Sequence, residues 1–324
     1  MQQRRLGAKG PMVSAIGLGA MSFGGLFGPT DEAASLHCLD AMHEAGIDFI
    51  DTANIYGMGV SETVIGKWLA SRRPQVTLAT KASFVSDPER RIDNSAAHLR
   101  AELEGSLRRM GRDHVDLFYL HRRERARPLE EVTETLSRLM DEGKIGGYGL
   151  SEVAPDTIRA AHALLPVTAV QNEYSLWTRQ PELGVIQCCK ALGIAFVAFS
   201  PLARGMLGDT PLPRPQDGFR GSNPRFTEPN FSRNLAALAP FRAFCAARGW
   251  SVPATALAWV LAQGDHVIPI PGTRHARHLQ QWVAAADIRF SAEDRAEIDR
   301  LLPPGWAWGD RYGDHQLLAI ERYC

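Results

Sequence analysis

Long apolar runs are absent from this sequence of 324 residues, although 45% of its residues are hydrophobic. A membrane-spanning helix needs about 18 or more consecutive apolar residues, and no segment reaches that length. The opening residues, MQQRRLGAKG, are basic but lack the apolar stretch that follows in a secretory signal. We therefore expect a protein that has no membrane partner.

Net charge and paired cysteines are also lacking. Basic and acidic residues number 36 each, so no global field favours nucleic acid or an anionic membrane. The cysteines are odd in number and show no CxxC spacing, which argues against a disulfide framework or a zinc site. They are Cys38, Cys188, Cys189, Cys245 and Cys324. We expect a cytoplasmic, reducing setting and no bound metal.

What the sequence does contain is a regular alternation of short apolar runs and helical patterns. The runs are rich in Val, Ile, Phe and Leu, as expected for parallel strands buried on both faces. They occupy 15–20, 48–51, 76–80, 115–120, 146–151, 168–174, 194–200 and 266–270. Helical patterns follow at 31–45, 62–70, 95–109, 129–142, 155–164, 181–192, 233–248, 253–263, 275–286 and 292–302.

Eight such strand–helix units predict an α/β fold, a (β/α)8 TIM barrel that spans residues 1–324 as a single domain. An open doubly wound sheet is the structural alternative. A Gly-Pro turn at 10–11 indicates an N-terminal hairpin that closes the lower end of the barrel. Two long connections, 205–231 and the tail after Pro303, are candidates for walls of a pocket at the opposite, C-terminal face.

Polar side chains stand at the carboxyl ends of the predicted strands. From the second strand to the seventh they are Asp51, Lys81, His121, Ser151, Gln171 with Asn172, and Ser200. A polar residue at the end of a single strand carries little information. A set that converges on the mouth where barrel enzymes place their sites is a stronger signal.

Ordered motifs contain these residues. The motif D-T-A-x-x-Y-G occupies 51–57 and continues into Ser61-Glu62. Further motifs are Thr80-Lys81, Leu120-His121, Gly149-Leu150-Ser151, Gln171-Asn172-Glu173-Tyr174, Ser200-Pro201-Leu202 and Ile270-Pro271-Gly272-Thr273-Arg274. Each motif is weak alone, but the ordered set resembles the aldo-keto reductase family over nearly the whole chain. The resemblance implies an oxidoreductase that uses a nicotinamide dinucleotide.

The residue types suit carbonyl reduction, which needs a hydride at carbon and a proton at oxygen. Tyrosine, with an unperturbed pKa of about 10, holds a proton at neutral pH, and a nearby cation lowers that pKa. We therefore assign Tyr56 as the general acid, Lys81 as the cation and Asp51 as the partner of Lys81. His121 would orient the substrate oxygen. These roles match what the resemblance implies.

Taken singly, each of these four residues has a simpler interpretation. Asp51 could cap a helix, Lys81 could lie at the surface, and Tyr56 could be a loop aromatic with a hydrated hydroxyl. His121 precedes two arginines and could belong to a solvated basic run. The functional interpretation depends on their order at the ends of successive strands.

The resemblance also implies an extended nicotinamide dinucleotide. Ser151, Glu152 and Gln171 would hold the carboxamide, and Phe199 would stack on the nicotinamide ring. Ser200 and Pro201 belong to the same segment, in which Leu202, Arg204 and Gly205 would follow the pyrophosphate. Gly272, Thr273 and Arg274 would meet a 2′-phosphate, which favours NADP(H) over NAD(H). His278 and Gln281 would lie at the adenosine end.

Some positions depart from the family pattern. Glu152 stands where the family often has asparagine, and a carboxylate cannot donate to the carboxamide oxygen. Gln281-Trp282 stand where a Glu-Asn pair often completes the adenosine site. The early Gly17-Leu18-Gly19 lacks a third glycine at Ser22, so it is not a Rossmann fingerprint.

An apolar substrate pocket could draw on Phe23, Met58, Trp306 and Trp308, although packing in the core is the simpler role for large apolar residues. We expect an NADPH-dependent reductase of small aldehydes or ketones, sugar-derived ones among them. A physiological alcohol or sugar dehydrogenase and a cofactor-binding regulatory subunit are the alternatives. No heptad or apolar patch indicates an oligomeric state.

Overall fold

A barrel of eight parallel strands forms the centre of the computed structural model, which describes residues 1–85, 91–215, 218–317 and 320–321. Neighbouring strands pair in the order β12-β11-β10-β9-β8-β5-β4-β3, all in parallel. In chain order they are β3 (Leu18–Gly19), β4 (Phe49–Asp51), β5 (Thr77–Ala82), β8 (Leu117–Leu120), β9 (Tyr148–Ser151), β10 (Ala169–Glu173), β11 (Ala195–Phe199) and β12 (Val267–Ile270). The predicted (β/α)8 fold is confirmed.

Backbone contacts between the first and last strands close the barrel. The amide of Gly17 donates to the Pro269 carbonyl and that of Gly19 to the Pro271 carbonyl, each at 2.9 Å. A Cβ on Gly19 would lie 2.8 Å from the Ile270 carbonyl oxygen, so only glycine allows this approach. The first predicted strand therefore pairs over fewer residues than the expected 15–20.

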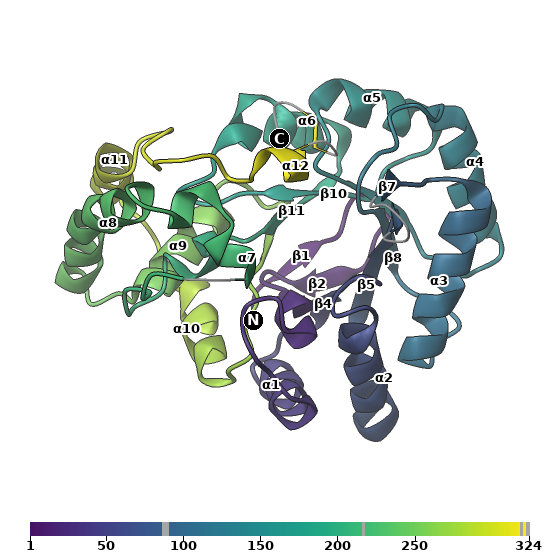
Figure 1. Ribbon diagram of the computed structural model, residues 1–324, viewed down its shortest axis with the longest axis horizontal. Coiled ribbons are helices and arrows are strands. Elements are labelled where there is room, and N and C mark those ends of the chain that lie inside the picture. Colours follow the sequence, from purple (N-terminus) through teal and green to yellow (C-terminus); the bar gives the residue numbers. More distant parts are fainter. Residues whose placement is uncertain (86–90, 216–217, 318–319, 322–324) are drawn as a thin grey trace.

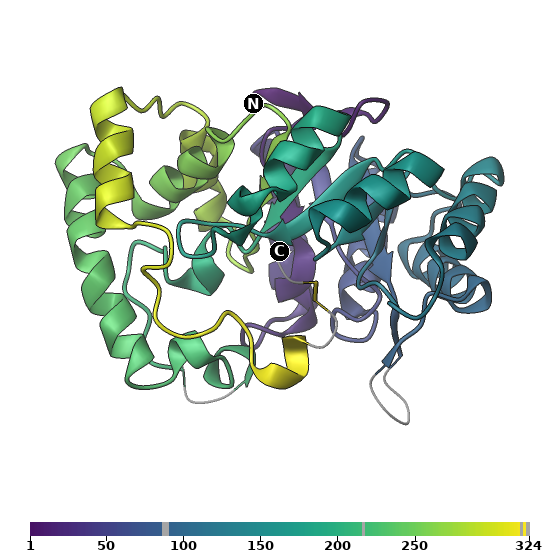
Figure 2. The same ribbon diagram turned by 90° about the horizontal axis from the view of Figure 1, so that it is seen from above.

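Helices surround the strands in both views (Figures 1 and 2). They are α1 (Glu32–Glu44), α2 (Val60–Arg72), α3 (Ala96–Met110), α4 (Leu129–Asp141), α5 (Pro155–Leu164), α6 (Val185–Leu192), α8 (Asn230–Ala247), α9 (Val252–Leu261), α10 (Arg277–Ala285) and α11 (Ala292–Leu301). Several begin where a short polar side chain satisfies a first-turn amide, as Asp31 does for Ala34 at 2.7 Å. Ser291 and Asp294 form a reciprocal capping box at the start of α11.

An N-terminal hairpin covers the bottom of the barrel, as predicted. It consists of β1 (Gln3–Arg5) and β2 (Met12–Ser14), which pair antiparallel. Leu6 and Val13 of this region pack with Phe49 and Ile268 in the barrel interior. Apolar side chains thus fill the lower half of the barrel interior, and Arg4 of the hairpin closes this end by donating to the Gly264 and Leu261 carbonyls.

The two long connections contain more structure than the sequence indicated. The segment after β11 includes the short helices α7 (Gly218–Gly221) and η4 (Pro224–Phe226). The segment after α11 lies along it and ends in α12 (Asp314–Leu317), drawn in yellow in Figure 2. Asn223 donates to the Arg311 carbonyl at 2.6 Å, and Trp308 donates its amide to Asn234 at 2.8 Å.

A second hairpin, β6 (Phe84–Val85) with β7 (Arg91–Ile92), was not predicted. It rises from the upper end of β5, beside the mouth of the barrel. Within the described residues, no helix combines the length and the apolar character needed to cross a membrane.

Candidate active site

The carboxyl ends of the strands bring the predicted polar residues to one mouth. Asp51 ends β4, Lys81 lies one residue before the end of β5, and His121 immediately follows β8. Ser151 ends β9, and Gln171 lies in β10. Their convergence follows from the parallel register of the sheet, in which Asp51 faces Ala79 and Lys81 faces Tyr119.

A buried ion pair forms the floor of this mouth. Lys81 Nζ donates to Asp51 Oδ1 and also to the Thr52 carbonyl, the latter at 2.8 Å. The other oxygen of Asp51 accepts from Gln171 Nε2 at 2.7 Å. Asp51 is 2% exposed and Lys81 is fully buried. Burial lowers the pKa of Lys81 more than any other single cause, but the charges of Asp51 and Tyr56 and the hydrogen bonds to them together outweigh it, and the net pKa is raised above its usual value.

Tyr56 and His121 lie above the ion pair. Lys81 Nζ is 5.2 Å from the centroid of the Tyr56 ring. The Tyr56 and His121 rings meet edge to face, with centroids 5.9 Å apart and an interplanar angle of 83°. Phe84 packs edge-on against the other side of His121 at 5.0 Å. The four residues predicted from the motifs are therefore brought together.

The pKa of Tyr56 differs from the expected direction. Burial raises this pKa most strongly, and the nearby Lys81 opposes the shift, as expected for a cation, without reversing it. The net pKa lies above the usual value for tyrosine. At neutral pH the phenol therefore retains its proton, which is the state that a general acid needs.

Next to these residues opens a cavity of about 1170 Å³. Its lining includes every predicted cofactor residue except Glu152: Ser151, Gln171, Phe199, Ser200, Pro201, Leu202, Arg204, Gly205, Gly272, Thr273, Arg274, His278 and Gln281. Asp51, Tyr56 and His121 line it as well. A continuous cavity thus joins Tyr56 and His121 to the predicted adenosine end.

Several arginines line the part of the cavity away from Tyr56 and His121. Arg220 Nε donates to the Arg204 carbonyl at 2.7 Å, and Arg274 Nη1 donates to the Phe27 carbonyl at 2.5 Å. Burial, followed by the nearby charges of Arg274 and Arg204, lowers the pKa of Arg220 to about 10. Arg204 Nε and Nη1 are buried and have no hydrogen-bond partner among the described residues. These features fit a site for a multiply charged anion.

A strained turn after β11 shapes this end. Ser200, Ala203 and Arg204 have φ values of 51°, 52° and 55°, in the left-handed region that residues with a Cβ rarely adopt. Gly205 follows at φ 103°. Such conformations cost about 1–3 kcal/mol each and concentrate at ligand sites. Here they bend the chain so that every residue from Ser200 to Gly205 except the buried Ala203 lines the cavity.

Glu152 is the predicted cofactor residue that the structure does not bring to the cavity. It has a φ of 57°, is 1% exposed and forms an ion pair with Arg311 at 2.7 Å. Its Oε1 accepts from the amide of Glu173 at 2.8 Å. The carboxylate thus anchors the C-terminal segment instead of lying beside Ser151.

The four predicted substrate residues also lie away from the cavity. Phe23 is buried in the core, and Met58 is 75% exposed at a loop. Trp306 donates to the Leu176 carbonyl at 2.7 Å, and the ring of Trp308 packs under the Arg233 guanidinium at 4.5 Å. Trp306 thus ties the C-terminal connection to the loop after β10, and Trp308 ties it to α8; none of the four residues lines the cavity.

Other aromatic residues provide the walls. Phe27, Phe84, Phe219 and Tyr312 line the cavity, and Phe27 and Phe219 meet edge to face at 5.6 Å. Tyr312 stacks under the Arg204 guanidinium at 4.5 Å. These residues and Arg220 were not predicted from the sequence, because they lie in loops or in elements of two to four residues that carry no motif.

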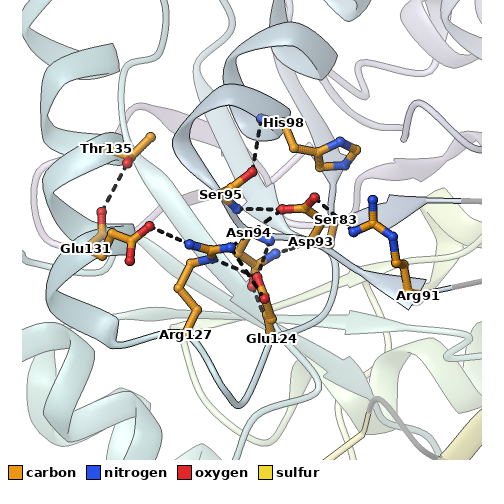
Figure 3. Close-up of polar contacts among 10 residues, drawn as sticks. All are labelled: Ser83, Arg91, Asp93, Asn94, Ser95, His98, Glu124, Arg127, Glu131 and Thr135. Atoms are coloured by element: carbon orange, nitrogen blue, oxygen red, sulfur yellow. Dashed lines mark hydrogen bonds and ion pairs between the residues drawn. The ribbon is translucent and has the colours of Figure 1, made fainter.

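A polar network beside the mouth ties the loop after β8 to the start of α3 (Figure 3). The amides of Asn94 and Glu124 exchange hydrogen bonds with each other's side chains, both at 2.7 Å. Asn94 Nδ2 also donates to Ser83 Oγ at 2.9 Å, and Arg127 Nε donates to Glu124 at 2.7 Å. The loop that begins at His121 is thereby fixed from its far side.

Known proteins share this architecture. A family model described as "Aldo/keto reductase family" matches residues 15–303. A probable aldo-keto reductase 1 of Glycine max is 36% identical over 96% of this chain and 92% of its own length. An aldo-keto reductase of Schizosaccharomyces pombe, whose name specifies NADP(+), is 35% identical over 93% of this chain and 92% of its own length.

A solved structure agrees in fold. The glycerol dehydrogenase of Gluconobacter oxydans superposes with a TM-score of 0.84 and 28% identity, covering 93% of this chain and 94% of that one. The match of the family model, the identity to the curated relatives and the shared barrel lead to the same assignment. The chain belongs to the aldo/keto reductase family and is an NAD(P)H-dependent oxidoreductase.

Proposed function

We propose that this enzyme reduces small aldehydes and ketones to alcohols with NADPH, and that Tyr56 donates the proton. The observation that carries the proposal is the position of Tyr56, which lies edge-on to His121 and above the buried Lys81–Asp51 pair. All of this lies at one end of a cavity whose other end is lined by arginines. Sugar-derived carbonyl compounds are included in this substrate class.

Each residue has a separate task. The Tyr56 hydroxyl gives its proton to the carbonyl oxygen, and the charge of Lys81 stabilises the phenolate that remains. Asp51 keeps Lys81 charged in its buried position, and Gln171 holds the second oxygen of Asp51. His121 donates a hydrogen bond that orients the substrate oxygen. Bound NADPH supplies the hydride that the carbonyl carbon receives.

The arginines support NADP(H) as the cofactor, with NAD(H) as the alternative. Arg204 is paired with the buried Glu173 at 2.9 Å, whereas Arg220 and Arg274 form no ion pair among the described residues. The phosphates of the cofactor would supply the countercharge that Arg220 and Arg274 lack. Arg274 is the residue that would hold the 2′-phosphate. The label of the S. pombe relative agrees with this choice.

Substitution of Tyr56 by phenylalanine tests the proton-donor role. Tyr56→Phe removes the acidic hydroxyl and keeps the ring, so we expect the rate of NADPH oxidation with an aldehyde to fall by roughly 10²–10⁴-fold. NADPH affinity, measured by fluorescence titration, should change little. A variant that reduces aldehydes at the wild-type rate would show that another group donates the proton.

Oxidation of an alcohol is the second candidate, because the structurally similar protein of G. oxydans is a glycerol dehydrogenase. The same residues can act in reverse, with Tyr56 accepting the proton. Rates in both directions, measured with both cofactors on aldehyde and polyol panels, decide between the directions. A protein that binds NADPH but turns over no substrate would instead be a binding subunit.

A further inference from the structure

Arg122 brings a positive charge to the substrate end of the cavity. It follows His121 directly and lines the cavity with it. Its Nη1 donates to the His121 carbonyl at 2.6 Å and approaches Ser151 Oγ at 3.3 Å. A guanidinium carries five N–H donors, and these contacts engage only Nη1. Arg122 forms no ion pair with any carboxylate in the part of the chain that the structure describes.

The position of Arg122 is fixed from behind. Its amide donates to Ser83 Oγ at 3.3 Å, and Ser83 also accepts from Asn94. Two residues further on, Glu124 exchanges hydrogen bonds with Asn94 in the network of Figure 3. The backbone on both sides of Arg122 is therefore held against the start of α3. A charge fixed in this way is preorganised for a ligand.

The acidic residues of the cavity lining have other partners. Among the described residues that line it, the carboxylates are Asp51 and Asp209. Asp51 is bound by Lys81 and Gln171, and Asp209 accepts from the Val252 amide at 2.8 Å and from Gln281 at 2.6 Å. The arginines at the far end suit the cofactor phosphates, which leaves the charge of Arg122 beside the reacting carbonyl.

We propose that Arg122 selects substrates that carry a carboxylate in addition to the carbonyl, so that oxo acids and aldehyde acids are preferred to neutral carbonyl compounds. This inference rests on the proposed reductase function. A planar carboxylate matches the fork of a guanidinium, and the pairing is strong where water is excluded. Phe84, whose ring lies 5.9 Å from the Arg122 guanidinium carbon, and Tyr312 provide apolar walls for the rest of the molecule.

Two probes with the same ring and aldehyde test the preference. They are 4-carboxybenzaldehyde and its methyl ester, methyl 4-formylbenzoate, which differ in charge. We expect kcat/KM of Arg122→Met to fall by roughly ten- to 100-fold for the carboxylate, as for a lost charge-assisted hydrogen bond, while the ester changes little. Arg122→Lys should keep part of the preference, and the exposed Arg112→Met should keep all of it.

Equal losses for both probes in Arg122→Met would overturn the inference. So would a wild-type enzyme whose rates on the two probes respond identically to added salt, because the carboxylate contact should weaken as salt screens it. If the wild-type enzyme reduces the ester well but shows neither effect, the reductase function stands and the substrate inference fails.

Binding provides a readout that does not depend on turnover. Calorimetric titration of NADPH-loaded Tyr56→Phe with 4-carboxybenzaldehyde should give a Kd at least about tenfold lower than in Tyr56→Phe/Arg122→Met. Equal Kd values in the two variants would overturn the inference. This difference stays measurable if no probe is reduced, an outcome that would refute the proposed function alone.

Discussion

At the scale of single residues, the buried Lys81–Asp51 pair governs the site. Two charges removed from water are tolerated because they pair with each other and because Thr52 and Gln171 satisfy the remaining donors and acceptors. The pair places a fixed positive charge 5.2 Å from the Tyr56 ring. Burial nevertheless raises the pKa of Tyr56, so in the proposed mechanism the pair would stabilise the phenolate formed during reduction more than the resting phenol.

Breaking the pair should cost both stability and activity. Lys81→Met leaves the Asp51 carboxylate buried beside an apolar side chain, and loss of one partner of a buried pair typically costs about 3–5 kcal/mol. We expect a corresponding drop in the free energy of unfolding, measured by urea denaturation. Carbonyl reduction should fall as well, because the phenolate loses its counter-charge.

The double variant Asp51→Asn/Lys81→Met separates the two effects. It removes both charges and retains an amide that can still bond to Gln171, so most of the lost stability should return. Activity should remain low, since Lys81 is still missing. Recovery of activity together with stability would mean that the pair is structural and that Tyr56 acts without it.

The convergence of the four proposed catalytic residues was predictable, and the residues of the cavity walls were not. Asp51, Tyr56, Lys81 and His121 follow from strand ends whose register the parallel sheet imposes. Glu152 was misplaced because a positive φ of 57° turns it toward Arg311, a residue more than 150 positions later in the chain. No local pattern in the sequence reports such a partner.

At the scale of elements, the start of α3 holds the loop that carries His121. Asp93 accepts from the Ser95 amide at 2.8 Å, Ser95 caps the helix, and Asn94 joins Glu124 (Figure 3). Burial raises the pKa of Asp93, but the hydrogen bonds from Ser95 and Arg91 outweigh it and lower the pKa to about 2. The charged carboxylate therefore stabilises the folded state.

This shift predicts a pH dependence of stability. The stabilisation is fully present above the unfolded-state pKa of about 4 and is lost as the pH falls towards about 2. Asp93→Asn should lower the free energy of unfolding by up to about 2 kcal/mol at neutral pH. The difference from the wild-type protein should shrink steadily when urea denaturation is repeated at lower pH.

Asp113→Asn, at an exposed position, is the matched control and should show no such trend. If the gap between wild type and Asp93→Asn is the same at every pH, the carboxylate charge is not what stabilises this loop. The neutral hydrogen bond to Ser95, which asparagine can retain, would then account for its role.

Helices were easier to predict than short strands because their ends carry chemical signals. The predicted helices 95–109, 155–164 and 292–302 begin within one residue of α3, α5 and α11, where Ser95 and Ser291 cap the first turn and Pro155 occupies it. The β6–β7 hairpin pairs only Phe84–Val85 with Arg91–Ile92, too few residues for a period of two to be recognised. Phe84, which packs on His121, was missed for the same reason.

At the scale of the whole molecule, the cavity is assembled from segments far apart in the sequence. Phe27 comes after β3, the first strand of the barrel. Phe219 and Arg220 lie in the connection after β11, and Arg274 follows β12. They meet through the Phe27–Phe219 contact, the Arg220 guanidinium 4.8 Å from the Phe27 ring and the hydrogen bond from Arg274 to Phe27. Arg274 was predicted from a motif. Arg220 carries no motif, and only the folded structure shows that it lines the cavity.

This arrangement predicts how the cofactors stabilise the fold. A ligand that binds only the folded protein raises its stability in proportion to the logarithm of the ratio of ligand concentration to Kd. Because the proposed contact with the 2′-phosphate would give NADPH the lower Kd, NADPH should raise the Tm more than NADH at equal concentration. Arg274→Ala should weaken NADPH by about ten- to 100-fold, the loss of a charge-assisted contact, and should reduce the difference between the two cofactors.

Thermal denaturation with each cofactor gives the measurement. Arg289→Ala is the control. The Arg289 side chain donates only to carbonyls within three residues of it in the chain, those of Ala286 at 2.6 Å and Ile288 at 3.1 Å. Arg274 also bonds to the Phe27 carbonyl, so its loss could loosen the wall instead of removing a phosphate contact. In that case NADPH and NADH would weaken equally, and the preference for the 2′-phosphate would have to reside in another arginine of the cavity.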